Sequence, residues 1–519
     1  MLAVGWPPPH TSDMQGRSEP NRELLDAAAL CRQLVPKASV EAFLADHRQE
    51  LFPDQLFEDL FPSGRGRPSV PADVIASVMV LQALDGLSDR DAARALTDRI
   101  SWKVACGLAV DEEGFHPTVL TYWRNRLRAS ARPERVFDAV RVVVEATGVL
   151  KGKTRRAIDS TLLDDAVATQ DTVTQIISAI RRVRREVPDA AGVPLRAYDY
   201  DQGAKPLIAW DDPVAKHALV SALITDALAL VEALEDSSLT AEQTDAVGLL
   251  ALVAGQDVEP GDDPGTWRIA EKVAPDRVIS TVDPEARHMH KSVSHYRDGY
   301  KAHLAVEPDT GLITAASLTP ANTADGPTGV ALLEREGPGL EVLADSAYGS
   351  GETRAALERA RHRALIKPIP LRSAVPDGFT LEDFAIDTAA RTVTCPLGIT
   401  VPITLHGRAV FGARCRGCPL RQRCTRRRNG RVLKLHPHHD LLAEGRRQAR
   451  TEGFAITYRR HRPMVERSIA WLVADGHRRV RFRGVARNQQ GLLLRVAAIN
   501  LRRLIALGLD HHEGWVLAT

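Results

Sequence analysis

The sequence predicts an α/β protein with a mixed sheet, joined to an all-helical N-terminal domain, a helical insertion and a small cysteine-rich insertion. Three observations support this prediction. Short apolar runs typical of strands alternate with helical segments over residues 277–367. Apolar residues recur at three- and four-residue steps before residue 150 and again over residues 164–276. Four cysteines lie within residues 395–424, in a stretch with little periodicity.

The composition is that of a folded protein of several domains. The chain has 519 residues, of which 44% are hydrophobic and 26% charged. We expect no membrane span, because no run of about 18 apolar residues is evident. Residues 1–20 lack the charged start and apolar core of a secretory signal, and we expect them to form a flexible tail. Six cysteines without an export signal favour a reducing cytoplasm.

Charge is distributed unevenly along the chain. Residues 401–510 hold 25 Lys and Arg against 6 Asp and Glu, a net charge of +19, whereas the remaining residues carry a net −17. This separation favours a polyanionic partner, most often nucleic acid, bound by the basic end. A basic surface on an ordinary enzyme is the alternative interpretation. Residues 164–276 carry a net −12 and are not expected to touch DNA.

The N-terminal segment, residues 21–150, has the pattern of a helix-turn-helix DNA-binding domain. Gly86 ends a strongly apolar helix, and Ser88 caps the next one. A further helix after residue 116 combines aromatic side chains with arginines, as a DNA-reading helix would. A plain helical bundle with an arginine-rich solvent face is the alternative. The arginines expected to contact DNA here are Arg124, Arg126 and Arg128.

The α/β core is predicted to be assembled from three separate stretches of the chain. These are residues 151–163, 277–371 and 441–510. Strands are expected at 155–163, 277–282, 299–306, 312–318, 340–345 and 364–367, with a helix at 352–363. The helical insertion is placed at residues 164–276 and the cysteine-rich insertion at residues 372–440.

Three acids stand out by their local setting. Asp159 lies inside a strand, Asp345 ends another, and Glu466 lies near the start of a basic helix whose beginning Pro463 favours. Phosphoryl transfer on DNA uses two divalent ions about 3.5–4 Å apart, and Mg²⁺ prefers carboxylate oxygens. By position alone these acids could equally cap turns or form surface ion pairs. Four other acids are rivals: Asp164, Asp165, Asp283 and Asp298.

Three segments resemble the acid-bearing motifs of DDE transposases from bacterial insertion sequences. They are AIDST at 157–161, VLADSAYG at 342–349 and YRRHRPMVE at 458–466. Residues 65–130 resemble the N-terminal domain of that group. Its central hairpin and its C-terminal helices are matched by residues 280–291, 298–306, 478–484 and 498–503. Several motifs in the same order, over most of the chain, make the resemblance specific.

The resemblance implies a ribonuclease-H-like catalytic core. Such a protein binds the terminal inverted repeats of its element, cuts there, and joins the ends to target DNA by attack of a 3′ hydroxyl. Asp159, Asp345 and Glu466 would hold Mg²⁺ or Mn²⁺, as two ions, and Tyr458 and Arg462 would assist at the DNA backbone. The family often has a Lys about two turns after the glutamate. Here residues 469–474 contain none, and Arg478 or Arg479 could substitute.

Double-stranded DNA is therefore the expected partner, both as element ends and as target. We expect a homodimer on DNA, acting at the nucleoid in the cytoplasm of a bacterium. The further basic residues expected to contact DNA are Lys291, Lys301, Arg421, Arg426, Arg427, Arg478, Arg479 and Arg481.

The cysteine cluster predicts a structural zinc site. Cys395, Cys415, Cys418 and Cys424 include one Cys-x-x-Cys knuckle, and four thiolates suit closed tetrahedral zinc. A region of about 70 residues with so few apolar positions needs such a staple. The alternatives are an iron–sulfur cluster, free thiols, or a ligand from a neighbouring histidine: His436, His438 or His439.

Three functions remain open from the sequence. The leading hypothesis is an active transposase. The others are a catalytically inactive, domesticated transposase that acts as a DNA-binding regulator, and a hydrolytic nuclease of the same fold. Joining and hydrolysis use the same metal pair and differ only in the attacking hydroxyl, so the sequence does not separate them.

Overall fold

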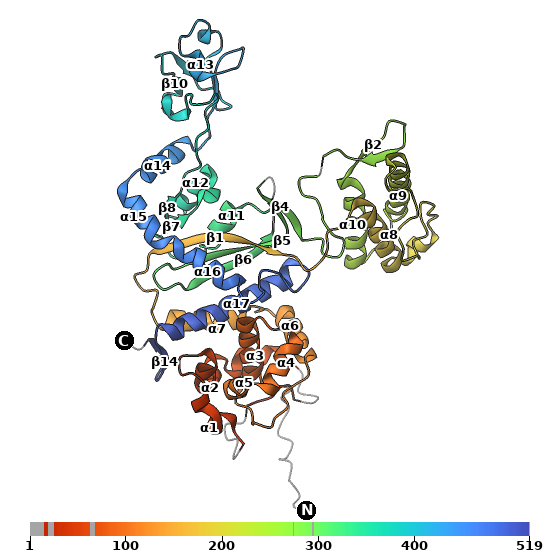
Figure 1. Cartoon of the computed structure of the whole chain (residues 1–519), viewed down its shortest axis with the longest axis vertical. Helices are drawn as coiled ribbons and strands as arrows, with labels where there is room; N and C mark the ends of the chain where they lie inside the picture. Colours follow the sequence, from red (N-terminus) through yellow and green to blue (C-terminus); the bar gives the residue numbers. More distant parts are fainter. Residues whose placement is uncertain (1–14, 19–24, 63–67, 273, 293–294, 518–519) are drawn as a thin grey trace, which may run out of the picture.

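The structure is a computed structural model that describes residues 15–18, 25–62, 68–272, 274–292 and 295–517. Figure 1 shows four parts: a group of helices near the N-terminus, a sheet above them, a helical arm to one side, and the cysteine-rich part at the far end. The sheet lies where the other three parts meet.

The central sheet is mixed, as predicted, with six strands in the order β4–β5–β1–β7–β8 and β6 also paired with β5. β1 runs antiparallel to β5 and parallel to β7, and β7 runs parallel to β8. The two inner strands, β1 and β7, therefore place their carboxyl ends at the same edge. The strands are β1 (Arg155–Asp164), β4 (Arg287–Ser292), β5 (His295–Val306), β6 (Ile313–Pro320), β7 (Glu341–Ala344) and β8 (Arg363–Ile366).

Helices cover both faces of this sheet (Figure 1). Successive side chains of a strand point to opposite faces, so Ile158 and Asp159 of β1 face different helices. A Cβ on Gly329 of α11 would lie 2.9 Å from Ile158, whereas Asp159 contacts Arg462 at the start of α16. The helices on the Ile158 face are α11 (Asp325–Ala331) and α12 (Gly351–Arg359), followed by α14 (His439–Ala449). Those on the Asp159 side are α15 (Glu452–His461), α16 (Pro463–Val473) and α17 (Val485–Ala506).

The N-terminal helices form as the sequence predicts. Gly86 ends α3 in the left-handed conformation (φ 68°), and the Ser88 hydroxyl accepts a hydrogen bond from the first turn of α4. α3 is buried on nearly every side, since its residues share one continuous core with α17 and the sheet. The helices are α1 (Ala27–Cys31), α2 (Val40–Leu51), α3 (Ala72–Asp85), α4 (Asp89–Asp98), α5 (Ile100–Cys106), α6 (Thr118–Ala129) and α7 (Arg135–Ala146), with short 3₁₀ turns η1 to η3 between residues 32 and 60.

The expected N-terminal tail is only partly described. Residues 1–14, 19 and 20 lie outside the described part of the chain. Gln15 is buried, and the Ser18 hydroxyl donates to the carboxylate of Asp73 in α3 (2.7 Å). The segment 15–18 therefore packs on the helical domain, which differs from a flexible tail.

The insertion at residues 164–276 is helical, with a core of its own. α9 is long and apolar enough to cross a membrane by length and composition alone. Core helices of soluble proteins pass the same test, and α9 packs Leu219, Leu223 and Leu230 against its neighbours. The elements are α8 (Thr172–Glu186), η4 (Pro188–Gly192), α9 (Pro213–Ala233), α10 (Ala241–Gln256), β2 (Val258–Pro260) and β3 (Trp267–Ile269).

The cysteine-rich insertion folds around a small separate core that includes Phe384, Val393 and Phe411. Its elements are short, consistent with the weak periodicity of its sequence. They are η6 (Leu381–Asp383), β9 (Ala385–Asp387), β10 (Thr392–Thr394), β11 (Thr400–Pro402), β12 (Arg408–Val410), η7 (Gly412–Cys415), α13 (Arg421–Cys424) and β13 (Val432–Lys434). The chain also contains η5 (Ser346–Tyr348) and a C-terminal hairpin, β14 (Leu509–His511) and β15 (Trp515–Leu517).

One predicted strand is wrong. Residues 277–282 form no strand beyond an isolated bridge between Val278 and Arg287. Backbone groups there bind glutamine side chains instead of a neighbouring strand: Val278 N–H donates to Gln256, and Thr281 N–H donates to Gln170. β4, which the sequence analysis did not predict, takes the sheet edge next to β5.

Candidate active site

Two of the predicted carboxylates lie side by side just beyond the point where the pairing of β1 with β7 ends. Ala157 of β1 pairs with Leu343 of β7, and Asp159 and Asp345 each follow two residues later. Asp159 continues inside β1, opposite Leu304 of β5, whereas Asp345 leaves its strand and caps η5 by accepting the Ala347 N–H (2.9 Å). The sequence therefore brings two motifs almost 190 residues apart to one sheet edge.

The third motif reaches the same edge from the junction of α15 and α16. Pro463 occupies the first turn of α16, so Tyr458 and Glu466 lie on separate helices. Arg462, at the junction, places Nη2 2.7 Å from Oδ2 of Asp159 and Nη1 3.5 Å from Oε1 of Glu466. The Tyr458 hydroxyl donates to the carbonyl of Ala344, the last residue of β7 (3.4 Å). All five predicted active-site residues, Asp345 included, thus lie around one point.

Burial and charge oppose each other at this centre. Burial raises the pKa of Asp159; the Arg462 guanidinium and the Ser160 N–H counteract this, while the charge of Asp345 adds to it. Burial also disfavours the charge on Arg462, yet Asp159 raises the pKa of that guanidinium above its usual value. Burial raises the pKa of Tyr458 as well. Glu466, with its side chain 65% exposed, is the open side of the site.

The carboxylates are not arranged as a metal site. Over the residues that the structure describes, no group of three or more His, Cys, Asp or Glu side chains could hold a metal ion. The Arg462 guanidinium instead lies against Asp159 and Glu466, two of the three expected ligands. Asp159, Asp345 and Glu466 have the right chemistry for a divalent cation, but they would have to move to bind one.

A second polar cluster lies on the opposite face of the same strands. Lys301, an expected DNA contact, is 3% exposed; its ammonium donates to the Thr323 carbonyl (2.7 Å) and pairs with Asp325 (3.2 Å). The Ser160 hydroxyl also donates to Asp325 (2.7 Å). Burial lowers the pKa of the neighbouring His303 to about 4. In this structure Lys301 fixes the strands behind Asp159 and does not face solvent.

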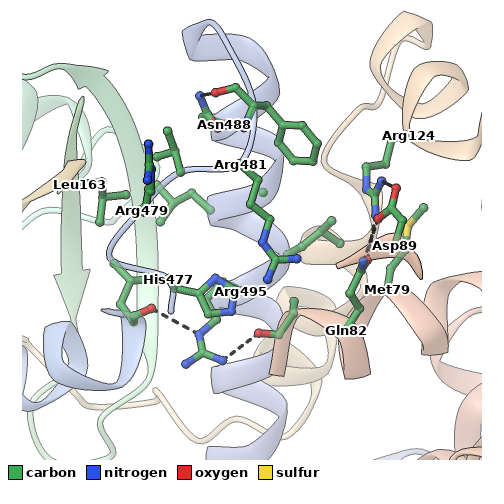
Figure 2. A pocket seen from close by; sticks show the side chains of 17 residues that line it. Met79, Gln82, Asp89, Arg124, Leu163, His477, Arg479, Arg481, Asn488 and Arg495 are labelled. Carbon is green, nitrogen blue, oxygen red and sulfur yellow. Dashed lines mark hydrogen bonds and ion pairs between the residues drawn. The ribbon is translucent and has the colours of Figure 1, made fainter. Parts of the chain in front are cut away.

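Of the three arginines expected to contact DNA from the predicted DNA-reading helix, α6, one is buried. Arg124 is 8% exposed, and its guanidinium binds Asp89 (2.6 Å) and Gln82 (2.7 Å), as Figure 2 shows. Arg124 therefore joins α6 to α3 and α4, and it does not reach solvent. Arg126 is exposed and lies over the ring of Phe61, and Arg128 donates to Asn125.

The arginines of the loop before α17 are hydrogen-bonded within the protein, although Arg479 and Arg481 are also exposed. Arg478 donates to the Thr161 hydroxyl and the Leu162 carbonyl, at the far end of β1. Arg479 donates to the carbonyl of Asp165, and Arg481 to the carbonyls of Gly86 and Leu87. This loop therefore ties the end of β1 to the turn between α3 and α4. The side chain of Lys291 lies outside the described part of the structure.

Beneath this loop lies a cavity of about 90 Å³ between the N-terminal helices and α17 (Figure 2). Arg495 of α17, 2% exposed, donates to the carbonyls of Ala83 and Leu84 at the end of α3 (2.7 Å each) and of Trp471 in α16 (2.6 Å). His477 lines the same cavity, and burial lowers its pKa to about 4. The sequence analysis missed both residues, because nothing local distinguishes a buried arginine in an arginine-rich helix.

The four clustered cysteines line one small cavity of about 20 Å³ and are not joined by disulfides. Gly398 and Gly417, both with positive φ, form tight turns beside Cys395 and Cys418. The thiols are nevertheless not positioned to hold a metal as they stand. Arg421 binds the carbonyls of Cys415, Arg427 and Arg428 and so stabilises the loop, while the Arg426 and Arg427 side chains are exposed.

Comparisons with known families agree with this geometry. The family model described as Transposase DDE domain matches residues 403–505, which contain Tyr458, Arg462 and Glu466. A second model, described as Transposase domain (DUF772), matches residues 31–126. These two matches support a DDE-type transposase of the insertion-sequence kind. No curated protein and no solved structure matches it.

The two matched segments meet in the structure of this transposase. Residues 31–126 supply α2 to α6, and residues 403–505 supply α15, α16 and nearly all of α17. Asp159 and Asp345 lie outside both matches. They connect to the matched DDE segment through the Asp159–Arg462 ion pair and the hydrogen bond from Tyr458 to Ala344.

Proposed function

We propose that this transposase binds the terminal inverted repeats of an insertion sequence, cuts DNA at their ends and joins those ends to a target. The observation that carries the proposal is the meeting of three distant motifs at one sheet edge. Arg462, four residues before Glu466, contacts Asp159, and Tyr458 binds the backbone next to Asp345. A chance resemblance of isolated acids would not bring all three motifs together.

We propose further that the sheet is a ribonuclease-H-like catalytic core. Its support is the order of the strands, with β5 antiparallel to its three partners, β1, β4 and β6, and with β1, β7 and β8 parallel. Helices on both faces bury the sheet, while the carboxyl ends of β1 and β7 remain accessible at Glu466. A helical insertion and the cysteine-rich insertion extend from this core.

The roles of the site residues follow from their surroundings. Asp159, Asp345 and Glu466 would hold Mg²⁺ or Mn²⁺, as two ions, once the centre rearranges. Such ions would activate the attacking hydroxyl or water and stabilise the leaving oxygen. Tyr458 fixes the end of β7, and thereby Asp345, through the Ala344 carbonyl. Arg462 is the cation within reach of two of the carboxylates.

DNA is the proposed partner, bound mainly through exposed basic side chains. On α6 these include Arg126, and in the cysteine-rich insertion Arg426 and Arg427. Arg124 and Lys301 are left out of this surface because both are buried in internal ion pairs. We also propose that two copies act together on DNA, at the bacterial nucleoid, because two element ends must be processed.

A structural zinc ion in the cysteine-rich insertion remains a proposal. The four thiols line one cavity, and the small core around Phe411 offers little other stabilisation. The test is the zinc content of the purified chain and of a variant with serine at Cys415 and Cys418. About one zinc per chain in the wild type, lost in the variant, would support the proposal. Equal zinc content in both proteins would contradict it.

The main test is cleavage of a duplex that carries the flanking terminal repeat, with Mg²⁺ or Mn²⁺ present. We expect the wild type to nick at the repeat end. Asp159→Ala, Asp345→Ala and Glu466→Ala should bind the same duplex without cutting it. A 3′-hydroxyl donor end in the same reaction distinguishes joining from hydrolysis.

A DNA-binding regulator is the second candidate. The absence of a ready metal site among the described residues is the observation that favours it. Repeat binding by the wild type without any cutting in either metal would establish that function in place of transposition.

A further inference from the structure

Both carboxylate oxygens of the acid most central to the site already accept a hydrogen bond. Oδ1 of Asp159 accepts the Ser160 N–H (2.8 Å), and Oδ2 accepts Nη2 of Arg462 (2.7 Å). The Asp159 side chain is 17% exposed and that of Arg462 only 6%. The contact between them is therefore a buried, charge-assisted hydrogen bond, a class stronger than the same pair would be in water. A cation that approached Asp159 would have to replace it.

Arg462, in contrast, is poorly satisfied. Its Nε and Nη1 are buried without a hydrogen-bond partner. Nη1 lies 3.5 Å from Glu466, close enough to attract that carboxylate but without a formed hydrogen bond. Burying a guanidinium whose N–H groups lack hydrogen-bond partners costs free energy. A ligand that binds Asp159 more strongly could therefore displace Arg462.

We propose that Arg462 stands in for a divalent cation in the resting transposase and must release Asp159 before Asp159 can ligate an ion. This inference rests on the proposed function, in which Asp159, Asp345 and Glu466 hold the ion. It explains why residues of the right chemistry do not form a metal site here. The single positive charge that balances Asp159 and partly balances Glu466 comes from the chain itself.

The position of Arg462 in the fold makes such a release feasible. Arg462 is at once the C-terminal cap of α15 and the N-terminal cap of α16. The junction breaks at Pro463, so the Arg462 side chain can change rotamer without unwinding either helix. Tyr458, one turn earlier, remains bound to the Ala344 carbonyl of β7 and keeps α15 in place.

While Arg462 is bound to Asp159, it lowers the apparent affinity of the centre for a metal ion. If only the fraction of molecules with Arg462 released can bind an ion, the apparent Kd is the intrinsic Kd divided by that fraction. Removing the guanidinium should therefore tighten metal binding, although it removes a residue placed in the active centre. A purely structural Arg462 would give the opposite result, because its loss would disorder Asp159 and weaken binding.

The experiment measures Mn²⁺ binding to the full chain without DNA, by electron paramagnetic resonance of free Mn²⁺. Four proteins are compared: wild type, Arg462→Gln, Arg460→Gln and Asp159→Asn. Arg460 is an exposed arginine on the same helix, so its variant removes one positive charge without touching Asp159. We expect Arg462→Gln to bind Mn²⁺ about tenfold more tightly than wild type, the scale of one charge-assisted hydrogen bond. Arg460→Gln should match wild type, and Asp159→Asn should lose binding.

The possible outcomes distinguish failure of this inference from failure of the proposed function on which it rests. Binding lost in Asp159→Asn but equal or weaker in Arg462→Gln overturns the stand-in and leaves the proposed metal centre intact. No binding to any of the four proteins overturns both. Tightening in Arg460→Gln equal to that in Arg462→Gln shows a general charge effect and also overturns the stand-in.

A second variant guards against misfolding of Arg462→Gln. Arg462→Lys keeps the positive charge on a shorter, single-headed ammonium that cannot span Asp159 and Glu466 together. We expect its Mn²⁺ affinity to lie between those of wild type and Arg462→Gln, with a larger Mn²⁺-induced rise in melting temperature than wild type. An affinity and a melting shift equal to wild type would contradict the proposal.

Discussion

Arg495 offers the sharpest test of how the two segments matched by family models are joined. We predict that Arg495→Met destabilises the unit formed by the N-terminal helices, the sheet and α17. The guanidinium donates to Ala83 and Leu84 at the end of α3 and to Trp471 in α16, and it pairs with Asp475 (3.2 Å). These carbonyls belong to the last turns of two helices, which have no partners within their own helix. One side chain thus satisfies the ends of two helices from different parts of the chain.

The magnitude follows from these contacts. Three short hydrogen bonds from a charged donor, at about 1.5–3 kcal/mol each, would contribute roughly 5–9 kcal/mol. Taking the guanidinium out of water costs several kcal/mol, which offsets part of that sum. Methionine fills the volume but leaves the carbonyls buried and unpaired. We therefore expect the free energy of unfolding to fall by about 3–5 kcal/mol, the usual cost of breaking a buried charge network.

Urea unfolding followed by tryptophan fluorescence measures this loss. The matched control is Arg502→Met, since Arg502 is an exposed arginine on the same helix. Its expected effect is within about 0.5 kcal/mol of wild type, as for most surface substitutions. If both variants unfold at the same urea concentration as wild type, Arg495 does not stabilise the contact of α17 with α3 and α16, and the prediction is wrong.

Three further predictions concern a turn, a histidine and the DNA surface. Gly86→Ala should lower the free energy of unfolding in urea by about 3 kcal/mol or more, since its Cβ would lie 2.1 Å from a backbone oxygen. The control is Gly148→Ala, which has a similar φ but open space around it and should lower that free energy by about 1 kcal/mol. His477 becomes protonated near pH 6.5 in the unfolded chain and near pH 4 in the folded chain, so the folded state loses stability as the pH falls through that window. The loss should be about 2 kcal/mol at pH 5. His477→Gln should lose correspondingly less stability between pH 7 and pH 5. Replacing Arg426 and Arg427 with Gln should reduce the salt dependence of DNA binding by about two units of slope in a log–log plot, and an unchanged slope would remove them from the DNA surface.

The sequence was most informative where local pattern and chemistry coincide. β1, β5, β6, β7 and β8 were predicted near their observed positions, because short apolar or alternating runs have a distinct local pattern. Pro463 and Gly86 marked helix boundaries correctly for the same reason: each residue restricts or frees its own backbone. The existence and type of these elements depended on residues close together in the chain.

Contacts between distant segments could not be predicted in the same way. Arg462 finds Asp159 across about 300 residues, and only the assembled sheet brings them together. Residues 277–282 have the composition of a strand, but glutamine side chains from the helical insertion satisfy their backbone. Arg124 and Lys301 look like surface charges in the sequence because the acids that bury them lie far away along the chain or on another element.

These buried cations change how the basic end of the chain should be understood. The net charge of +19 over residues 401–510 counts every arginine as if it could meet a phosphate. Several cannot: Arg462 binds Asp159, Arg495 binds helix ends, and Arg503 donates to the Thr310 carbonyl (2.6 Å). Each of these arginines donates to an acceptor inside the protein, and its guanidinium is therefore not free to bind a DNA phosphate. With about 0.9 units of salt slope per phosphate contact, the full excess would give a slope near −17. We expect a shallower slope, and its measured size would report how many arginines remain available to DNA.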